Sequence, residues 1–258
     1  MTAPDCPNSS DCPVPNPPGE TGIPGGSRRR SKQKLIGGFP TVQWKSGRIV
    51  CRGYQLKWGY DSFNPGFGDT RFAPIVSSEG VSVPTIYLGE NETAVLQESV
   101  FHDVHHSLAG GQIYEAIVRT WAVAYVELPV DLTLVDLRNS SLTDRGLTRE
   151  QLAATTAEHY PCTRQWAAWF HQQGADGLVW HSRQSELHLS RLKGRSEIEG
   201  SAKEHELEVC VLFGDRVPSN PGSYPLIGSG VRNLIEGQGR ILLDQLAEQL
   251  GARIEWAY

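Results

Sequence analysis

The sequence has 258 residues, of which 39% are hydrophobic and 21% charged, and its formal net charge is −5 at pH 7. This length is enough for one large domain or two small ones with a sizeable core. The negative charge argues against a nucleic-acid-binding surface over the whole domain, and no apolar run reaches transmembrane length, so we expect neither direct nucleic-acid binding nor membrane insertion.

Residues 1–33 are rich in Pro, Gly, Ser and Asn and predict a disordered tail, because they cannot bury enough apolar surface to offset the entropy of ordering. The tail lacks the basic and apolar regions of a Sec signal peptide. The cysteines show no CxxC pair, and Cys6 with Cys12 alone is too weak a pattern for a metal site; the five are Cys6, Cys12, Cys51, Cys162 and Cys210. Such spacing favours free thiols in a reducing compartment. We therefore expect a cytoplasmic protein, or one delivered to a target cell's cytoplasm without a Sec signal.

The folded part is predicted to open with a strand pair over residues 42–54, in which Ser46-Gly47 forms the turn. Residues 58–74 then form a long irregular loop dense in Gly, Pro, Asn and aromatic residues, a composition typical of functional or mobile loops.

A short apolar strand at 85–88 is followed by a predicted helix, and this unit is the centre of the expected fold. Gly89 ends the strand, and the Asn91 side chain can cap the helix. One helical face is apolar as far as residue 108 and is expected to pack on a core; it comprises Leu96, Val100, Phe101, Val104 and Leu108.

Further strands are predicted at 119–128, 132–137, 177–180 and 206–213. Thr148 to Gln151 fits a capping box that opens a short helix, and residues 163–173 form a Trp-rich helix that ends at Gly174. Residues 184–204 are polar and predict a loop or an exposed helix, and an amphipathic helix is expected over 231–250, with a possible break at 236–239. Short strands mixed irregularly with helices indicate an α+β fold.

Glu98 lies at the border of the apolar face of the central helix, one turn before His102. A carboxylate in this position is partly desolvated, which suits it to a catalytic role. From spacing alone, a solvated carboxylate at the helix edge is the simpler interpretation. A decision between the two needs independent observations.

His102 and His106 are four residues apart on one helix, the spacing that zinc metalloproteases use. The motif has Asp103 in place of the usual glutamate, and no third ligand is apparent. Histidines placed favourably at the C-terminal end of a helix dipole explain the pattern better, and we expect no metal.

The sequence contains no glycine-rich phosphate loop and no nucleophile elbow around Ser182. An anionic ligand would therefore be held by side-chain cations. Arg52, which follows a predicted strand, and Arg71, within the aromatic loop, are the candidates, because guanidinium groups pair bidentately with phosphate oxygens. A surface or ion-pair role is the alternative for each arginine taken singly.

Several short motifs occur along the chain in a specific order: Cys51-Arg52-Gly53-Tyr54, Phe63-Asn64-Pro65, Thr70-Arg71-Phe72, Tyr87-Leu88-Gly89, Ala94 with Gln97-Glu98-Ser99, and Trp180-His181-Ser182. Their order and spacing resemble the RES domain family, which is named for its characteristic Arg, Glu and Ser. Arg52, Glu98 and Ser182 stand in the matching positions. The resemblance covers roughly residues 40–215.

The resemblance implies an α+β fold related to the ADP-ribosyltransferase toxins, with short mixed or antiparallel strands and surrounding helices. It divides the chain into the disordered tail 1–33, a RES domain over 34–217, and a C-terminal amphipathic helical extension over 218–258 that packs on the domain.

The family's typical members are toxins of bacterial toxin–antitoxin pairs. By resemblance, this protein is expected to use NAD⁺ as its substrate, without any other cofactor, and to cleave the bond between nicotinamide and ribose by hydrolysis or phosphorolysis. Transfer of ADP-ribose to a specific protein and a non-catalytic interaction module are the alternatives. An antitoxin or immunity protein encoded nearby is the expected partner.

Residue roles also follow from the resemblance. Glu98 would be the catalytic carboxylate, with Arg52 and Ser182 completing the catalytic set. Arg71 would bind the pyrophosphate and ribose together with Arg52, and Tyr87 would pack against nicotinamide or the adjoining ribose. Tyr54 would take the place of an aromatic residue that some relatives have directly after the first arginine.

Overall fold

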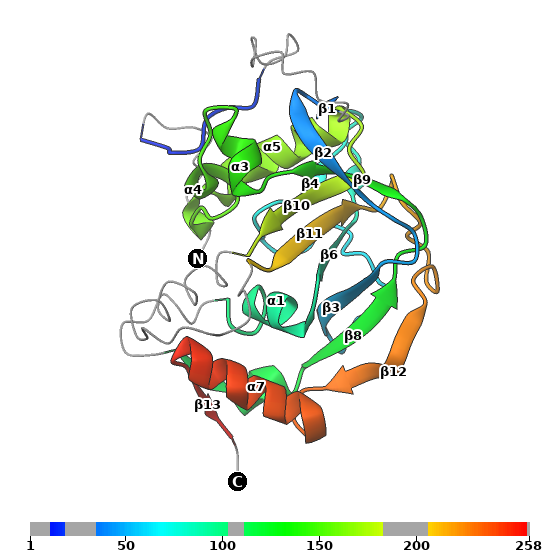
Figure 1. Ribbon diagram of the computed structural model, residues 1–258, viewed down its shortest axis with the longest axis vertical. Coiled ribbons are helices and arrows are strands. Elements are labelled where there is room, and N and C mark those ends of the chain that lie inside the picture. The colour runs from blue at the N-terminus through cyan, green and yellow to red at the C-terminus, as the bar shows by residue number, and fades with distance from the viewer. Residues whose placement is uncertain (1–10, 19–34, 103–110, 183–205, 257–258) are drawn as a thin grey trace, which may run out of the picture.

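The computed structural model describes residues 11–18, 35–102, 111–182 and 206–256. In these ranges the chain forms a nine-stranded sheet in the order β1-β2-β9-β10-β11-β6-β3-β8-β12 (Figure 1). All neighbouring strands are antiparallel except β9 and β10. The sheet is therefore mixed, and helices pack at both ends of it, which confirms the predicted α+β class. The strands of the sheet are β1 (Leu35–Ile36), β2 (Phe39–Trp44), β3 (Ile49–Gln55), β6 (Thr85–Gly89), β8 (Trp121–Glu127), β9 (Leu132–Asp136), β10 (Gly177–His181), β11 (Glu208–Phe213) and β12 (Leu226–Asn233).

The first two long strands lie where the alternating pattern predicts them, but they do not pair with each other. β2 pairs with β9, and β3 pairs with β8 and at one position with β6. The expected hairpin around Ser46-Gly47 is therefore wrong. Apart from the short pairing of β1 with the start of β2, each strand finds its partners among residues that are distant in sequence, so the turn between β2 and β3 connects two separated parts of the sheet.

Strand β11 shows how the sheet divides two apolar cores. Its residues alternate, with Val209, Val211 and Phe213 in one buried cluster and Cys210 and Leu212 in another. Successive side chains of a strand point to opposite faces, so a strand that is apolar at every position is covered on both sides.

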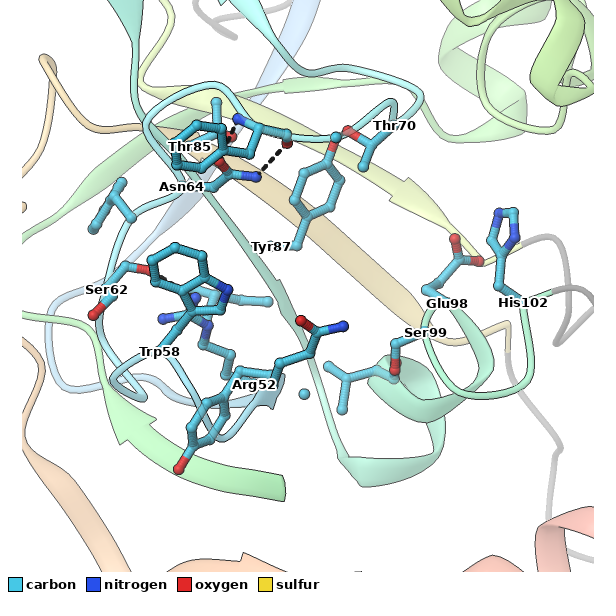
Figure 2. A pocket seen from close by; sticks show the side chains of 18 of the residues that line it. Arg52, Trp58, Ser62, Asn64, Thr70, Thr85, Tyr87, Glu98, Ser99 and His102 are labelled. Carbon is cyan, nitrogen blue, oxygen red and sulfur yellow. Dashed lines mark hydrogen bonds between the residues drawn. The ribbon is translucent and has the colours of Figure 1, made fainter. Parts of the chain in front are cut away.

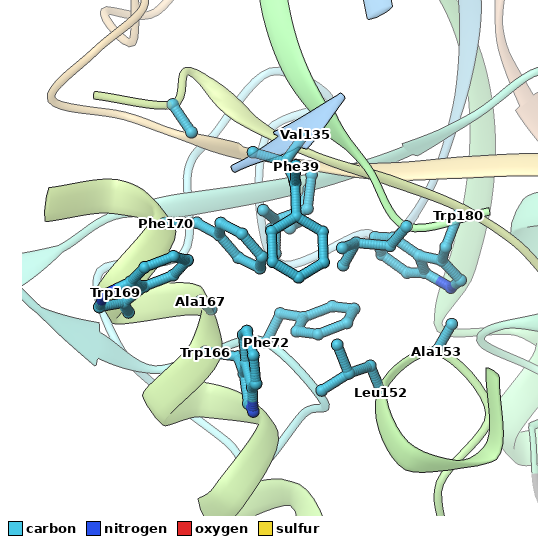
Figure 3. Close-up of a cluster of buried hydrophobic side chains, with 14 of the residues drawn as sticks. Phe39, Phe72, Val135, Leu152, Ala153, Trp166, Ala167, Trp169, Phe170 and Trp180 are labelled. Carbon is cyan, nitrogen blue, oxygen red and sulfur yellow. The ribbon is translucent and has the colours of Figure 1, made fainter. Parts of the chain in front are cut away.

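The larger cluster lies under helix α5 (Tyr160–Gln172), with the short helices α3 (Asn139–Thr143) and α4 (Arg149–Leu152) beside it. Phe39 meets the rings of three α5 residues, Trp166, Trp169 and Phe170, at centroid distances of 5.8, 6.4 and 5.0 Å (Figure 3). The capping box predicted at Thr148 and Gln151 is present at the start of α4. These contacts hold the helices against the part of the sheet that contains β2, β9 and β10.

The central helix α1 (Glu92–Gln97) begins as predicted, with the Asn91 side chain accepting a hydrogen bond from the Ala94 amide at 2.9 Å. It is shorter than predicted, because it ends at Gln97 and Glu98 is its C-cap. The Ser99 hydroxyl donates to the Val95 carbonyl at 2.6 Å, and the amide of Phe101 donates to the Leu96 carbonyl, so the chain turns and buries Phe101 completely. The predicted continuation over Val104 and Leu108 lies outside the described residues.

The C-terminal part contains more strand than predicted. The expected helix over 231–250 is replaced at its start by the end of β12, and helix α7 runs only over Gly237–Leu250. β12 pairs with β8, and α7 covers a third apolar cluster together with α1 (Figure 1). A parallel pair, β7 (Gln112–Tyr114) and β13 (Arg253–Glu255), lies beyond it, and helix α2 (Glu115–Val118) directly follows β7. Residues 218–258 thus supply an edge strand of the main sheet as well as the predicted helix.

Part of the N-terminal tail packs on the fold. Within residues 11–18, Val14 is buried in the cluster under α5, and the Trp166 indole donates a hydrogen bond to the Pro15 carbonyl at 2.7 Å. This contrasts with the disorder expected across residues 1–33. The large aromatic surface of α5 explains the difference, because it offers even a polar, proline-rich segment an apolar contact and a hydrogen-bond donor.

A short strand pair, β4 (Ile75–Val76) and β5 (Ser82–Val83), follows the aromatic loop and contacts α5.

Among the residues that the structure describes, no helix combines the length and apolar character needed to span a bilayer.

Candidate active site

A cavity of about 720 Å³ opens where strands β3 and β6 separate. The two strands pair only at Cys51 and Gly89; beyond that point β3 continues along β8, and β6 continues along β11. Both diverging strands line the cavity, and the loop over residues 57–71 and the end of α1 complete its walls. Its volume is within the range of small-molecule sites.

Two glycines seat α1 against these strands. A Cβ atom on Gly89 would lie 2.9 Å from Val95 Cγ1, and one on Gly53 would lie 3.3 Å from the Ser99 hydroxyl oxygen. A side chain at Gly89 would force a shift of Val95, and one at Gly53 would fit only if Ser99 or Val95 moved slightly. The close approach brings Glu98, at the helix end, to the cavity wall.

Glu98 is half-buried and accepts a hydrogen bond from the Ser182 hydroxyl at 2.6 Å between Ser182 Oγ and Glu98 Oε1. Ser182 directly follows β10 and is fully buried. Figure 2 shows Glu98 and His102 at one side of the cavity and Arg52 and Trp58 at the other. The serine therefore holds one carboxylate oxygen of Glu98, a residue that lines the cavity.

Arg149 holds the segment that carries Ser182. Its guanidinium donates to the carbonyls of His181 and Ser182 at 3.1 and 2.9 Å and forms an ion pair with Glu206 at 2.8 Å. The side chain is buried, so these charge-assisted bonds are strong. The sequence reasoning placed Arg149 in a capping box and missed this role. The signal available in the sequence was the polar run that begins at His181, directly after the apolar residues of the predicted strand 177–180.

Arg52 lines the cavity, but its guanidinium is largely engaged by the protein. Nη1 donates to the carbonyls of Gly59 and Tyr60 at 3.2 and 2.6 Å, and Nη2 donates to the Ser62 carbonyl at 2.6 Å. Only 8% of the residue is exposed. Burial lowers the pKa of Arg52 to about 10, which leaves it charged at neutral pH. Arg52 thus organises the aromatic loop as well as lining the cavity.

Arg71 lies at the opposite end of the same loop. It donates to the Thr155 carbonyl at 2.7 Å, and its guanidinium carbon stands 5.1 Å from the centre of the Tyr160 ring. The Tyr160 hydroxyl lies 3.1 Å from His102 Nε2, and all three residues line the cavity. The sequence reasoning weighed His102 only as a metal ligand or a polar residue at a helix end. It did not assign Tyr160, which comes from α5, far from His102 and Arg71 in sequence.

The two predicted tyrosines lie on the two diverging strands. The Tyr87 hydroxyl is 2.9 Å from Thr70 Oγ1 and accepts from the Phe72 amide at 3.2 Å, and burial raises the pKa of Tyr87 to about 12. Tyr54 is buried beneath Arg52, whose guanidinium carbon lies 5.6 Å from its ring centre. Tyr87 is therefore a neutral, fixed ring in the cavity wall.

An aromatic pair from the loop stands at the mouth of the cavity. Trp58 and Phe67 stack with a centroid distance of 6.2 Å and an interplanar angle of 22°. They are 45% and 63% exposed, in contrast to the buried rings deeper in the cavity. An exposed, preformed aromatic surface beside two guanidinium groups suits a ligand that carries both a flat ring and negative charge.

The described residues contain no group of three or more His, Cys, Asp or Glu side chains arranged to hold a metal ion. His102 instead pairs with Tyr160, and His106, the other histidine of the metal-like motif, lies outside the described ranges.

The structure brings the predicted site residues to one place. Five of them line the cavity: Arg52, Tyr54, Arg71, Tyr87 and Glu98. Ser182 contacts it through Glu98. The cavity is therefore a candidate small-molecule site, lined by aromatic and apolar residues together with two carboxylates, those of Glu98 and Asp69.

The chain belongs to the RES domain family, whose profile matches residues 48–190. Among solved structures it is similar to a chain in the crystal structure of the M. tuberculosis MbcT–MbcA toxin–antitoxin complex, with a TM-score of 0.50 and 15% sequence identity. The similarity covers 81% of this chain and 92% of that chain, and at this identity it shows a shared fold. A comparison with curated proteins gives no match.

Proposed function

We propose that this protein is a toxin that consumes NAD⁺ by breaking the N-glycosidic bond between nicotinamide and ribose. The observation that carries the proposal is that Glu98, Arg52 and Arg71 line one cavity. Membership of the RES domain family and the fold shared with a toxin–antitoxin structure support it.

The main requirement for cleaving the nicotinamide–ribose bond is a carboxylate held beside the ribose carbon that bears nicotinamide. As the bond between C1′ and nitrogen breaks, its electron pair leaves with nicotinamide, which becomes neutral, and the ribosyl group becomes cation-like. Glu98 stabilises that charge and accepts a hydrogen bond from the ribose 2′-hydroxyl, as carboxylates do in glycoside hydrolysis. An oxygen of water or phosphate then supplies the electron pair for the new bond at C1′, and where water attacks, one of its protons is released to solvent.

The remaining residues orient the dinucleotide. Arg71 and Arg52 attract the diphosphate, and the fixed ring of Tyr87 packs against the nicotinamide half. Binding energy from these remote groups is converted into the correct placement of the reacting carbon beside Glu98.

Replacing Ser182 with alanine should lower kcat for NAD⁺ cleavage about tenfold while KM stays nearly unchanged. The variant removes one hydrogen bond to a charged group, worth about 1.5 kcal/mol, that holds Glu98 rather than the substrate. Steady-state kinetics checks the split. Ser46→Ala, at an exposed turn, is the matched control and should behave as wild type. An unchanged kcat for Ser182→Ala would remove Ser182 from the positioning role.

Replacing Trp58 with alanine should raise KM for NAD⁺ about tenfold with little change in kcat, since stacking of a base on an aromatic ring is worth about 1–3 kcal/mol. Trp58→Phe keeps a ring at the mouth of the cavity and should remain within about threefold of wild type in the same assay. If Trp58→Phe and Trp58→Ala lose binding equally, the site requires the indole and not a stacking surface.

Incubation of the purified protein with NAD⁺ tests the proposed function directly. We expect loss of NAD⁺ with release of nicotinamide, followed by chromatography and mass spectrometry. Free ADP-ribose identifies water as the acceptor, ADP-ribose 1″-phosphate identifies phosphate, and a protein adduct would replace the proposal by ADP-ribosyl transfer. Undiminished NAD⁺ at micromolar protein, with no heat of NAD⁺ binding by calorimetry, would favour a non-catalytic module.

A protein partner follows from the same proposal. The similar solved chain comes from a toxin–antitoxin complex. We expect an antitoxin or immunity protein, encoded nearby, that protects the cytoplasm in which NAD⁺ is consumed. Co-expression with the neighbouring reading frame should restore the growth of cells that produce the toxin, and failure of every neighbour to do so would count against this partner.

A further inference from the structure

A second cluster of reactive side chains lies away from the cavity, between the N-terminal segment and α5. Cys12 Sγ is 3.5 Å from Cys162 Sγ and 3.6 Å from His159 Nδ1. Cys12 is half-buried, whereas Cys162 is 1% exposed. The two sulfur atoms are thus in contact although 150 residues separate them in sequence.

The contact is part of a docked segment rather than an isolated approach. Val14 is buried in the cluster under α5, and Pro15 accepts a hydrogen bond from the Trp166 indole at 2.7 Å. Trp166 lies one helical turn after Cys162 on the same helix. The segment is therefore held on the face of α5 that carries the buried thiol.

His159 is placed to take a proton from Cys12. Its Nε2 lies 3.5 Å from Glu158 Oε1, and that carboxylate oxygen also accepts from the Thr156 hydroxyl at 2.8 Å. A carboxylate beside Nε2 favours the tautomer with hydrogen on Nε2, which leaves Nδ1 as the acceptor for the Cys12 thiol. Because the thiolate is the attacking form of cysteine, this arrangement favours reaction at Cys12 first.

We propose that Cys12 and Cys162 form a redox-active thiol pair, which a low-molecular-weight disulfide such as oxidised glutathione converts to a protein disulfide. The Cys12 thiolate attacks one sulfur of the small disulfide and releases one glutathione thiol. Cys162 then attacks Cys12 Sγ of the mixed disulfide and releases the second glutathione. Two protein thiols are oxidised, one small disulfide is reduced to two thiols, and the product joins residues 11–18 covalently to α5.

The other described cysteines provide internal controls. Cys51 and Cys210 are fully buried in the sheet, and burial raises the pKa of each thiol well above its ordinary value. Both therefore stay protonated and shielded, and we expect them to remain reduced under conditions that oxidise the pair. This prediction does not depend on NAD⁺ cleavage.

The test is oxidation of the full-length protein with glutathione disulfide, followed by alkylation of the remaining thiols and peptide mapping by mass spectrometry without reductant. We expect one disulfide, Cys12 to Cys162, which dithiothreitol reverses, with Cys51 and Cys210 alkylated only after denaturation. In Cys162→Ser, a glutathione adduct should accumulate on Cys12, because the resolving thiol is missing. In His159→Gln, which keeps Cys162, the disulfide should form about fivefold more slowly at neutral pH.

Two results would overturn the proposal. One is a disulfide that joins Cys6, rather than Cys12, to Cys162, which Cys6→Ser would then abolish. The other is a Cys12 thiol that remains free under conditions that oxidise an exposed cysteine peptide. Circular dichroism of each variant separates these outcomes from a loss of folding.

Discussion

Glu98→Gln should lower the rate of NAD⁺ cleavage at least about 100-fold, because one preorganised electrostatic contact is worth about 2.7–4 kcal/mol in the transition state. The amide is nearly the same size as the carboxylate and can still accept the hydrogen bond from Ser182. It lacks the negative charge that stabilises the ribosyl cation. The loss should therefore appear in kcat, with KM close to that of wild type.

The measurement is single-turnover nicotinamide release, together with the Tm of the variant. Glu79→Gln is the matched control, because Glu79 is exposed in a turn outside the cavity. Both variants should unfold within about 2 °C of wild type, since a surface or isosteric polar change costs little stability. A rate within tenfold of wild type for Glu98→Gln would remove Glu98 from the catalytic role and leave the carboxylate as a ligand-binding group only.

Local patterns in the sequence predicted most of the elements but not their partners. The alternation in β3 and β8 and the Asn91 cap of α1 are properties of a few neighbouring residues, and the structure has them in the predicted places. Pairing of β2 with β9 depends on contacts across some 90 residues, which periodicity does not encode. The end of α1 was missed for the same reason, since the chain leaves the helix in order to bury Phe101 in a core built from distant elements.

The residues of the candidate site were also predicted from the sequence only in part. Glu98 and Arg52 were candidates from the helix pattern and from the lack of a phosphate loop, and the resemblance to a family then favoured them and added Ser182. The structure places Glu98 and Ser182 in hydrogen-bond contact. The support that Arg149 gives to the Ser182 segment was not predictable, because it joins α4 to the end of β10. The largest difference concerns Arg52, whose guanidinium was expected to serve the substrate and is largely used by backbone carbonyls.

Because backbone carbonyls use most of the Arg52 guanidinium, replacing Arg52 should change the stability of the protein as well as its activity. Arg52→Met should lower the free energy of unfolding by about 3 kcal/mol, because it removes part-buried hydrogen bonds from a charged donor, each worth about 1.5–3 kcal/mol. For a domain of this size we expect a fall in Tm of about 6–12 °C. The loop over residues 57–62 forms a wall of the cavity, so KM for NAD⁺ should rise and kcat should fall together.

Arg52→Lys distinguishes the two roles of this residue. It keeps the positive charge, but one ammonium group cannot reproduce the planar fork that reaches the carbonyls of Gly59, Tyr60 and Ser62. If loop organisation dominates, Arg52→Lys should lose nearly as much stability and activity as Arg52→Met. If charge on the diphosphate dominates, lysine should restore most of the activity and the Tm should hardly change in either variant. Arg253→Met, at an exposed side chain, serves as the control for thermal unfolding and should leave the Tm within about 2 °C of wild type, because surface substitutions cost little stability.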